Sequence, residues 1–473
     1  LLSIAGGMAG LIVAYIGADL LVAYAERFTT RASEIRIDKT VLLFTLVVSI
    51  ATGLAAGMLP LLSRRLGFRR CAATAIAPPA TPRRDVRRTL IVAQVAASFM
   101  LLIGAGLMVR SLMELTGVNP GFTSDHVLTM QIDINFSKYQ ENAERAAYHD
   151  RLMRRLQALP DVSSVGAAGM IPFLERSGSA FGRFVIEGQG MPAPPDRPRA
   201  SLLFASEDYF RTIDVPLLRG RFFERDDDLH APGVVIVNQS LADRYWPDGD
   251  PIGHRISADG VEWFTIVGVV ANLRQQLSLD PVDEIYSPLR QAPYVTTNWV
   301  LRTTREPDEL APIVREAVYE VDPDQPVYRM RPLDEVRAAS LASPRLTATL
   351  LGLFAVLALL ITATGIAGVI AFSVSQRTQE FGVRVALGAR RTDVVSMVVG
   401  EGVRLALTGL ALGAGGALLL GGLLSTMLFR VEPTDTVTYA AVSCVLLSVA
   451  ALACLVPALR AASVDPIQAL RTT

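Results

Sequence analysis

Six stretches of this chain are long and apolar enough to cross a lipid bilayer, and they limit its fold more than any other feature. A helix needs about 20 apolar residues to cross a hydrocarbon core of roughly 30 Å. The stretches are residues 1–25, 40–63, 89–109, 346–373, 405–429 and 436–459. Only the first contains a charged residue, Asp19. The chain is therefore expected to fold as a membrane α-helical bundle with six transmembrane helices.

The composition agrees with a membrane protein. Of the 473 residues, 51% are hydrophobic and 19% are charged, a balance that soluble chains rarely reach. The formal net charge is zero, which gives no reason to expect binding to nucleic acid. Leu1 lies inside an apolar run without a signal-peptide n-region before it, so the chain is interpreted as lacking part of its N-terminal region.

Charged loops predict how the spans are oriented. Residues 64–88 carry eight arginines against a single acidic residue, Asp85, and the positive-inside rule assigns such a loop to the cytoplasm. The other loops alternate from this one. Residues 377–404 are therefore expected inside, and the long insert 111–345 is expected outside.

The insert is expected to fold as an α/β (α+β) domain, because strand and helix patterns alternate along it. Val127–Ile134 has the alternation of a strand, and Ala143–Leu159 has apolar residues at helical spacing. Later strands are predicted at Arg183–Glu187, Gly233–Asn238, Phe264–Val270 and Trp299–Thr303, with a helix near Asp308–Glu320. This order suggests βαβ-type subdomains.

No catalytic or metal-binding motif is found in the sequence. The four histidines all lie in the insert and have no metal-ligand spacing, so no metal site is expected. A Walker A loop needs a lysine after a glycine, and neither Lys39 nor Lys138, the only two lysines, follows one. We therefore do not expect an enzyme or a bound cofactor, and a partner would have to supply any energy.

A charged segment between two spans, residues 375–396, is the strongest candidate for contact with a partner. If it were one helix, Arg377, Glu380, Arg384 and Arg391 would share a polar face. Glu380 precedes Arg384 in the favourable i,i+4 order. Because apolar runs flank the segment on both sides, it must lie at a membrane face.

The same segment carries apolar side chains and helix-weakening glycines. The side chains that supply apolar contact area are Phe381, Val383, Val385 and Leu387. Gly382 and Gly388 each weaken an isolated helix by about 1 kcal/mol relative to alanine, so the segment is expected to need a supporting surface. An interfacial amphipathic helix without a protein partner is the alternative interpretation.

The span at 405–429 is rich in glycine. Gly409 and Gly413 form a small-xxx-small pair, which lets the backbones of two helices approach closely. The pair is compatible with packing inside one bundle and equally with a dimer or pseudo-dimer interface.

Residues 1–62 are similar to residues 405–459. Ala56–Ser63 resembles Ala453–Arg460, with Pro60 and Pro457 in the same register. The first two spans therefore look like a second copy of the last two.

Residues 88–473 resemble the MacB/FtsX-like permeases of ABC transporters, specifically the duplicated bacterial form with two such halves in one polypeptide. The stretches that carry the resemblance are Val374–Ala389, Tyr245–Gly253, Ile266–Val270 and Val464–Arg471. The resemblance implies that residues 111–345 are a MacB-like periplasmic core domain. It also implies that residues 346–473 are an FtsX-like permease domain with three transmembrane helices.

The remaining segments take their roles from the same resemblance. Residues 1–63 would be two transmembrane helices left from a first permease half. Residues 64–88 would be a cytoplasmic basic linker, and residues 89–110 the transmembrane helix that leads into the periplasmic domain. The chain would lie in the bacterial inner membrane, in contact with lipid, as a pseudo-dimer or a homodimer.

The resemblance further implies a function. Residues 375–396 would form a cytoplasmic coupling helix that docks on a separate ABC ATPase, whose use of ATP would move the periplasmic domain. The candidate coupling residues are Glu380, Gly382, Arg384, Leu387, Gly388 and Ala389. The chain would be the permease subunit of an export or mechanotransmission system, with a periplasmic adaptor as a further partner.

Two other functions are compatible with the same residues. One is a transmembrane regulator of a periplasmic cell-wall hydrolase, and the other is a periplasmic scaffold that uses no ATPase. A neighbouring hydrolase gene would favour the first, and failure of every ATPase to copurify would favour the second. The sequence predicts no substrate.

Overall fold

The computed structural model divides into two compact units. The residues that it describes are 6–8, 10, 15, 40, 42–51, 54, 82–174, 180–190 and 192–463. The helical unit comprises Leu1–Thr116 and Ala342–Thr473, and the inserted unit comprises Gly117–Leu341. The inserted unit lies within the predicted insert, 111–345, because the flanking helices continue past their apolar runs.

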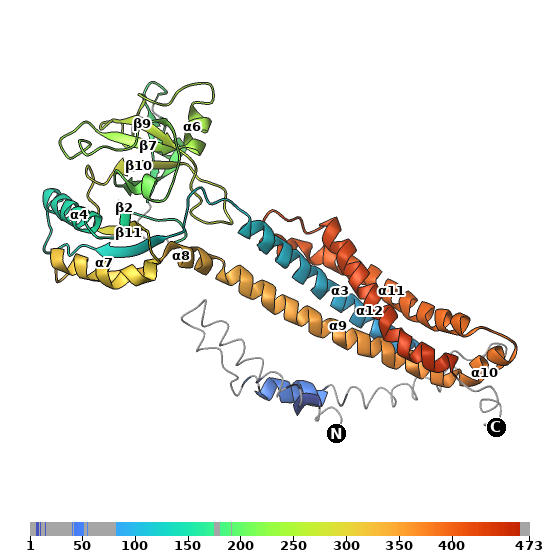
Figure 1. The fold of residues 1–473 in the computed structure, drawn as a ribbon. Helices are drawn as coiled ribbons and strands as arrows, with labels where there is room; N and C mark the ends of the chain where they lie inside the picture. The colour runs from blue at the N-terminus through green and yellow to red at the C-terminus, as the bar shows by residue number, and fades with distance from the viewer. Residues whose placement is uncertain are drawn as a thin grey trace. The chain divides into compact units, whose positions relative to one another are not determined.

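Four long helices form most of the described part of the helical unit, and they run alongside one another (Figure 1). They are α3 (Pro82–Thr116), α9 (Ala342–Gln376), α11 (Arg391–Ser425) and α12 (Thr436–Ala462). Each has an apolar stretch long enough to cross a bilayer. The four predicted spans that follow residue 88 are thus confirmed as apolar helices.

The predictions for the N-terminal region lie mostly outside the described residues. They concern the spans at 1–25 and 40–63, Asp19, and most of the linker at 64–88. Within the second span, Leu42–Ala51 is a short apolar helix. The terminal stretch Val464–Arg471 is also outside the described part. The total of six spans therefore stays a prediction.

Helix α3 packs against each of the other three long helices. Val95 and Phe99 on its inner face are completely buried. Ser98 donates a hydrogen bond to the carbonyl of Ala358 (3.1 Å) and accepts one from the Thr362 hydroxyl (2.7 Å), which joins α3 to α9. These bonds satisfy polar groups that would otherwise face an apolar interior.

The loop between α11 and α12 is held to the C-terminal part of α3. Asp435 caps α12 by accepting a hydrogen bond from the backbone of Thr438 (2.9 Å), and the same carboxylate pairs with Arg110. The backbone N–H of Phe429 donates to the Ser111 hydroxyl (2.8 Å). One helix end is thus fixed by a cap, an ion pair and a loop contact together.

Gly409 and Gly413 both face α3 of the same chain. A Cβ atom at Gly409 would lie 2.5 Å from the Cβ of Val95. One at Gly413 would lie 2.8 Å from the carbonyl oxygen of Ala96. Only residues without a Cβ allow the two helices this separation, so in this structure the pair serves packing within one chain.

We expect Gly409→Ala to destabilise the helical unit. The added methyl group would force α11 away from α3, at a cost of about 1–3 kcal/mol for overpacking. Thermal unfolding in detergent, followed by far-ultraviolet circular dichroism, should show the loss. Gly415→Ala is the matched control, because no atom lies within 4 Å of its added Cβ. Equal melting of the two variants would contradict this account of α3–α11 packing.

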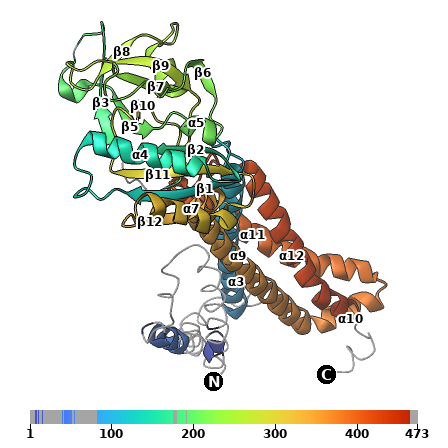
Figure 2. The ribbon, with the colours of Figure 1, turned by 60° about the vertical axis from the view of Figure 1, so that its left-hand side comes forward.

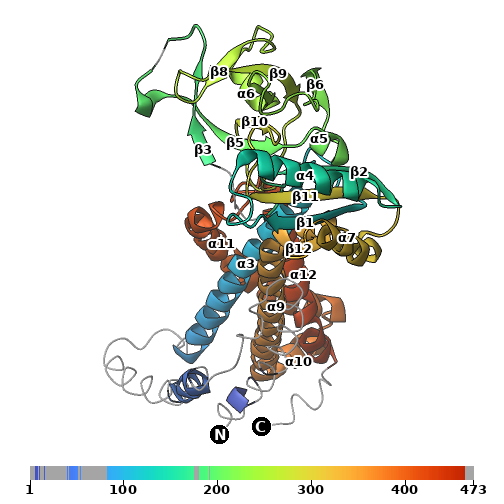
Figure 3. The same cartoon turned by 90° about the vertical axis from the view of Figure 1, so that its left-hand side faces the viewer.

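Half of the inserted unit is a ferredoxin-like arrangement of two split β–α–β units (Figures 2 and 3). Its elements are β1 (Val127–Asp133), α4 (Asn142–Gln157), β2 (Val162–Ala168), β11 (Thr296–Thr303), α7 (Pro307–Val321) and β12 (Val327–Pro332). The strand order is β12-β1-β11-β2, with antiparallel neighbours throughout. Helices α4 and α7 pack against each other over one buried cluster that includes Tyr148, Val314 and Trp299.

The other half is inserted between β2 and β11. Its strands are β3 (Ala180–Arg183), β4 (Val185–Ile186), β5 (Arg199–Ala205), β6 (Leu217–Gly220), β7 (Val234–Asn238), β8 (Arg255–Ser257), β9 (Phe264–Val270) and β10 (Glu284–Pro288). Its short helices are η2 (Pro194–Asp196), α5 (Tyr209–Thr212) and α6 (Gln239–Tyr245). A further short helix of the inserted unit, α8 (Leu333–Ser340), follows β12. The pairs β5–β10 and β7–β9 are parallel, so this half is a mixed sheet. Within the sheet, one residue pair, Ala168 with Ala205, joins β5 to β2, and α5 also packs against β2.

Most predicted elements of the insert are found within a few residues of their expected bounds. The single strand predicted at Arg183–Glu187 is divided between β3 and β4, because the chain changes partner strand there. β3 pairs with β5 and β4 pairs with β8, and at Phe184, between them, the backbone N–H donates to the carbonyl of Pro198 (3.0 Å).

Glu284 is a buried carboxyl group in the mixed sheet. It is completely inaccessible to solvent. Its oxygens accept hydrogen bonds from the Tyr286 hydroxyl (2.6 Å) and the Gln275 amide (2.8 Å). Desolvation of the charged form raises the pKa of Glu284 to about 7, although these two hydrogen bonds act in the opposite direction.

We expect Glu284 to make the inserted unit less stable as the pH rises. Because its folded pKa lies above its unfolded pKa, its contribution is fully present below the unfolded pKa, near pH 4.3, and is lost as the pH rises through about 7. Urea unfolding followed by tryptophan fluorescence can measure this. All three tryptophans, Trp246, Trp263 and Trp299, lie in the inserted unit.

The control for this titration is Glu284→Gln, which keeps the shape without the charge. Between about pH 5 and pH 7, wild-type protein should lose stability relative to this variant by up to about 1.4 kcal/mol per pH unit. A constant difference between the two proteins over that range would show that the carboxyl group does not titrate there.

Candidate functional site

The charged segment between two spans contains a short separate helix, α10 (Thr378–Ala386). Helix α9 ends at Gln376, and the backbone of Arg377 leaves the helical conformation with φ −113° and ψ 16°. The carbonyl of Arg377 then accepts the N–H of Phe381 (3.0 Å) in the first turn of α10. The single helix predicted over 375–396 is therefore divided into the end of α9, all of α10 and the start of α11.

The C-terminus of α10 is a Schellman motif centred on Gly388. Gly388 has φ +95°, in the left-handed region that favours glycine. Its N–H donates to the carbonyl of Val385 (3.1 Å), and the N–H of Ala389 donates to the carbonyl of Arg384 (3.0 Å). The next helix begins at once, with the side chain of Asp393 accepting the N–H of Arg390 (3.1 Å). This turn reverses the chain direction between α10 and α11.

One face of α10 is packed against the bundle and the other is open. Phe381 is 2% exposed and Gly382 is buried, and both lie where α10 contacts α9 and α12. Val383 is 40% exposed and Leu387 is 83% exposed, four residues apart on the open face. Phe381 was predicted to contact a partner, but it is occupied by the core of the helical unit.

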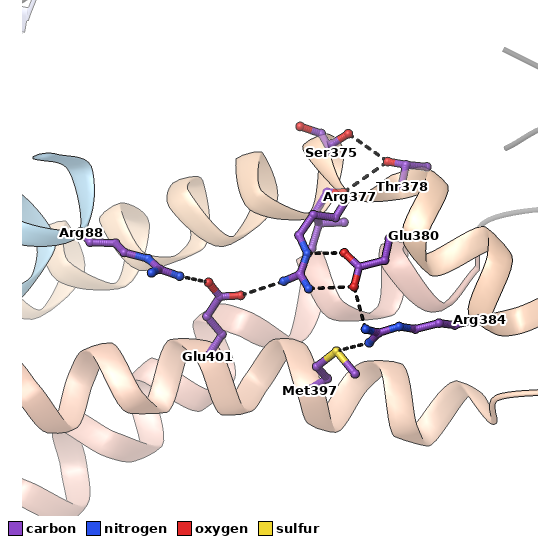
Figure 4. Close-up of polar contacts among 9 residues, drawn as sticks. Arg88, Ser375, Arg377, Thr378, Glu380, Arg384, Met397 and Glu401 are labelled. Atoms are coloured by element: carbon purple, nitrogen blue, oxygen red, sulfur yellow. Dashed lines mark hydrogen bonds and ion pairs between the residues drawn. The ribbon is translucent and has the colours of Figure 1, made fainter. Parts of the chain in front are cut away.

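A chain of alternating charges connects α10 to α11 and α3 (Figure 4). Glu380 accepts two hydrogen bonds from Arg377 (2.7 and 3.0 Å) and pairs with Arg384 (2.7 Å). Glu401 on α11 pairs with Arg377 (3.6 Å) and with Arg88 on α3 (2.5 Å). These side chains are partly buried, and the continuous network gives the pairs more weight than isolated surface pairs would have.

Arg384 has a further contact inside the molecule. Its Nη1 donates to the sulfur of Met397 on α11 at 2.9 Å, so the side chain bridges α10 and α11. Arg391 does not share the polar face of Arg377 and Glu380, contrary to the sequence prediction. The turn at Gly388 separates the two helices, and Arg391 is the first residue of α11.

The structure thus brings the predicted coupling residues together in one short region but gives them different surroundings. Glu380 and Arg384 belong to the ion network, Gly382 is buried, and Leu387 is exposed. Gly388 and Ala389 form the turn. The helix-packing glycines, Gly409 and Gly413, lie further along α11 against α3.

Sequence reasoning missed Arg88 and Glu401 as members of the ion network. The available signal was the position of Glu401 beside the uncharged run 405–429, where a carboxylate close to the bilayer needs a cation. Arg88 was assigned only to the basic linker, because a local pattern does not show which helix lies opposite. Both residues matter because they extend the network beyond α10.

No metal centre is found in the part of the chain that the structure describes, since no group of three or more potential ligands is present there. His149, for example, is a core residue. It is hydrogen-bonded to the carbonyl of Tyr294 (3.2 Å), and burial lowers its pKa to about 4.

The fold defines a class of polytopic helical protein with a large α/β domain between two of its apolar helices. Two family models match the chain: the MacB-like periplasmic core domain over residues 89–318 and the FtsX-like permease C-terminal domain over residues 352–466. The chain belongs to the MacB/FtsX-like permeases of ABC transporters. It is accordingly a membrane protein, and the inserted unit is its MacB-like periplasmic core domain.

Named relatives are similar to this chain in sequence. The macrolide export ATP-binding/permease protein MacB of Chromobacterium violaceum is 28% identical over 57% of this chain and 43% of its own length. The uncharacterized ABC transporter permease YknZ of Bacillus subtilis is 26% identical over 56% of this chain and 68% of its own. The chain thus spans less than half of the MacB sequence.

Among solved structures, the periplasmic region of MacB from Actinobacillus actinomycetemcomitans aligns with 47% of this chain and 96% of its own length. The two are 16% identical, with a TM-score of 0.32. This likeness is too weak to add to the family assignment.

We expect Gly388→Ala to loosen the turn after α10. No atom lies within 4 Å of an added Cβ at Gly388, so its effect is conformational: a left-handed alanine costs roughly 1 kcal/mol. Hydrogen–deuterium exchange of peptides covering residues 378–393 should become faster. Gly368→Ala on α9 is the control, since its added Cβ also meets open space but its backbone is not left-handed. Unchanged exchange in Gly388→Ala would refute this role.

Proposed function

We propose that this chain is the permease subunit of an ABC-type export or mechanotransmission system in the bacterial inner membrane, and that α10 docks on a separate ABC ATPase. Family membership supports an ATPase partner in general terms. The matched relatives include proteins named for export and ATP binding. Residues 1–473 contain no glycine-lysine pair for a Walker A loop, so the ATP-binding site would lie outside them.

The observation that carries the proposal is the exposed apolar pair Val383 and Leu387 on a helix that is otherwise firmly held. Leu387 is 83% exposed although Phe381, on the opposite face, is almost completely buried. A large apolar side chain on a rigid, charged surface is typical of an anchor for a protein partner. Arg384 and Arg390 lie beside the pair and would form the charged rim of that interface.

Motion at α10 has a defined route into the bundle. The backbone joins α10 to α9 and to α11 within a few residues. The network that includes Arg377, Glu401 and Arg88 adds α3 to the same group. Both α3 and α9 continue along the chain into the periplasmic core domain. An ATPase that displaces α10 would therefore act on the two helices that bear this domain.

Three further parts of the proposal rest on other grounds. Cytoplasmic placement of α10 rests on the positive-inside rule, applied to the arginine-rich loops. The periplasmic adaptor, and the pseudo-dimer or homodimer, rest on the family resemblance. Cell-wall hydrolase regulation and an ATPase-free scaffold stay as alternatives that the test below can distinguish.

The test is recovery of partners by full-length protein extracted from membranes, with mass spectrometry to identify them. We expect an ABC ATPase with the wild-type chain and a loss of at least about 30-fold with Leu387→Glu, because an apolar anchor would be replaced by a charge. Arg384→Glu is a poorer probe. Its carboxylate would face Glu380 and would disturb α10 from within.

Val437→Glu provides the matched control. Val437 is 64% exposed in the first turn of α12, at the other end of that helix from the α10 contact, and it receives the same charge. The ATPase should still be recovered with this variant. Equal recovery with Leu387→Glu would contradict docking through α10, and no ATPase with any protein would favour the scaffold. A recovered hydrolase would favour the regulator.

A further inference from the structure

A cleft of about 530 Å³ lies beside the ion network, between the start of α3, the end of α9 and the first half of α11. Its lining includes three arginines, Arg88, Arg377 and Arg404, and one carboxylate, Glu401. The floor continues along α11 to Leu405 and Thr408. The cleft therefore has arginines at one end, and its other end lies on the first residues of the apolar run 405–429.

The charges in the cleft are not balanced among the residues that the structure describes. Glu401 already pairs with both Arg88 and Arg377. Arg404 is exposed, and no ion pair to it is found in the described part of the chain. Arg377 is also paired with Glu380, so Arg404 is the arginine of the cleft that lacks a counter-charge among the described residues, and this makes the cleft a site for an anion.

The depth of the cleft identifies the kind of anion. Arg88 directly precedes the uncharged run 89–109, Arg377 directly follows the uncharged run 346–376, and Arg404 directly precedes 405–429. All three guanidinium groups thus sit where apolar helices leave the hydrocarbon core. This is the level of the phospholipid phosphates.

We propose that this cleft binds the phosphate headgroup of an anionic phospholipid. The guanidinium groups of Arg404, Arg88 and Arg377 would receive the headgroup phosphate, because arginine donates paired N–H groups to phosphate oxygens. Leu405 and Thr408 lie one turn deeper and would border the acyl chain. The site requires only that the helices span a membrane, and it does not depend on ATPase docking at α10.

A bound lipid would have a structural consequence for the network. It would contact α3, α9 and α11 at the same place where Glu401 connects them. The headgroup phosphate would supply the counter-charge that Arg404 lacks among the described residues. The lipid composition of the membrane would then influence the stability of the contacts among α3, α9 and α11 near Glu401.

The test is native mass spectrometry of the full-length protein in detergent, with added phosphatidylglycerol, cardiolipin or zwitterionic phosphatidylethanolamine. We expect retention of the two anionic lipids and not of phosphatidylethanolamine. Arg404→Gln should weaken that retention about fivefold, the weight of one basic residue near an anionic surface. Arg404→Lys should keep most of it, because the charge is preserved.

Arg460→Gln is the matched control. Arg460 is exposed, directly follows the uncharged run 436–459, and is not part of the cleft. It should retain lipid as the wild-type protein does. Inorganic phosphate is tested separately as a competitor, and it should not displace the lipid at millimolar concentration.

Three outcomes would overturn the proposal. They are equal retention of anionic and zwitterionic lipids, equal loss in Arg404→Gln and Arg460→Gln, and displacement by inorganic phosphate, which would indicate a site for a free anion. Arg404→Gln should still recover the ATPase in the partner experiment. Failure of the lipid site and failure of α10 docking are therefore distinguishable.

Discussion

The ion pairs of the Glu401 carboxylate hold together the end of the helical unit that contains α10. The carboxylate is shared between Arg88 on α3 and Arg377 at the junction of α9 and α10, so one acidic group on α11 holds two neighbouring chain segments. Partly buried charges of this kind must be paired, because an unpaired charge near the bilayer is costly. Removing the carboxylate would leave Arg88 without a counter-charge among the described residues, whereas Arg377 would still pair with Glu380. The arrangement of α10 follows from this, since Arg377 also begins that helix.

The rest of the bundle is held by close packing rather than by charge. α3 is central because it makes close contacts with two neighbouring helices. Ser98 bonds to α9, and Val95 and Ala96 pack against the glycines of α11. In a bilayer there is little hydrophobic gain from bringing two apolar helices together, so tight contact and a few hydrogen bonds must supply the stability. Ion pairs near the two ends of α3, at Arg88 and at Arg110, then fix its position along the bundle.

Sequence patterns predicted features that depend on one segment alone. They failed for features that depend on residues far away in the sequence. The four spans after residue 88 were found because length and the absence of charge are properties of each segment alone. The strand order and the break at Phe184 were not predicted, since they depend on which strands lie opposite. In the candidate site, Gly388 was noted as a weak point of a helix, but its left-handed turn was not foreseen. Helical periodicity likewise could not tell that Phe381 faces the core and Leu387 faces away.

The order of strands in the periplasmic core domain keeps the mixed half away from the chain segments that join this domain to α3 and α9. The chain enters the mixed half after β2 and leaves it before β11. These two strands are antiparallel neighbours in the sheet. The mixed half thus occupies the place of a hairpin loop, where insertions disturb a fold least. The chain from α3 and the chain to α9 both belong to the ferredoxin-like half. The two halves nevertheless share one buried cluster, to which Phe210 of the mixed half and Val300 of β11 both belong, so a change of shape in one half is transmitted to the core of the other.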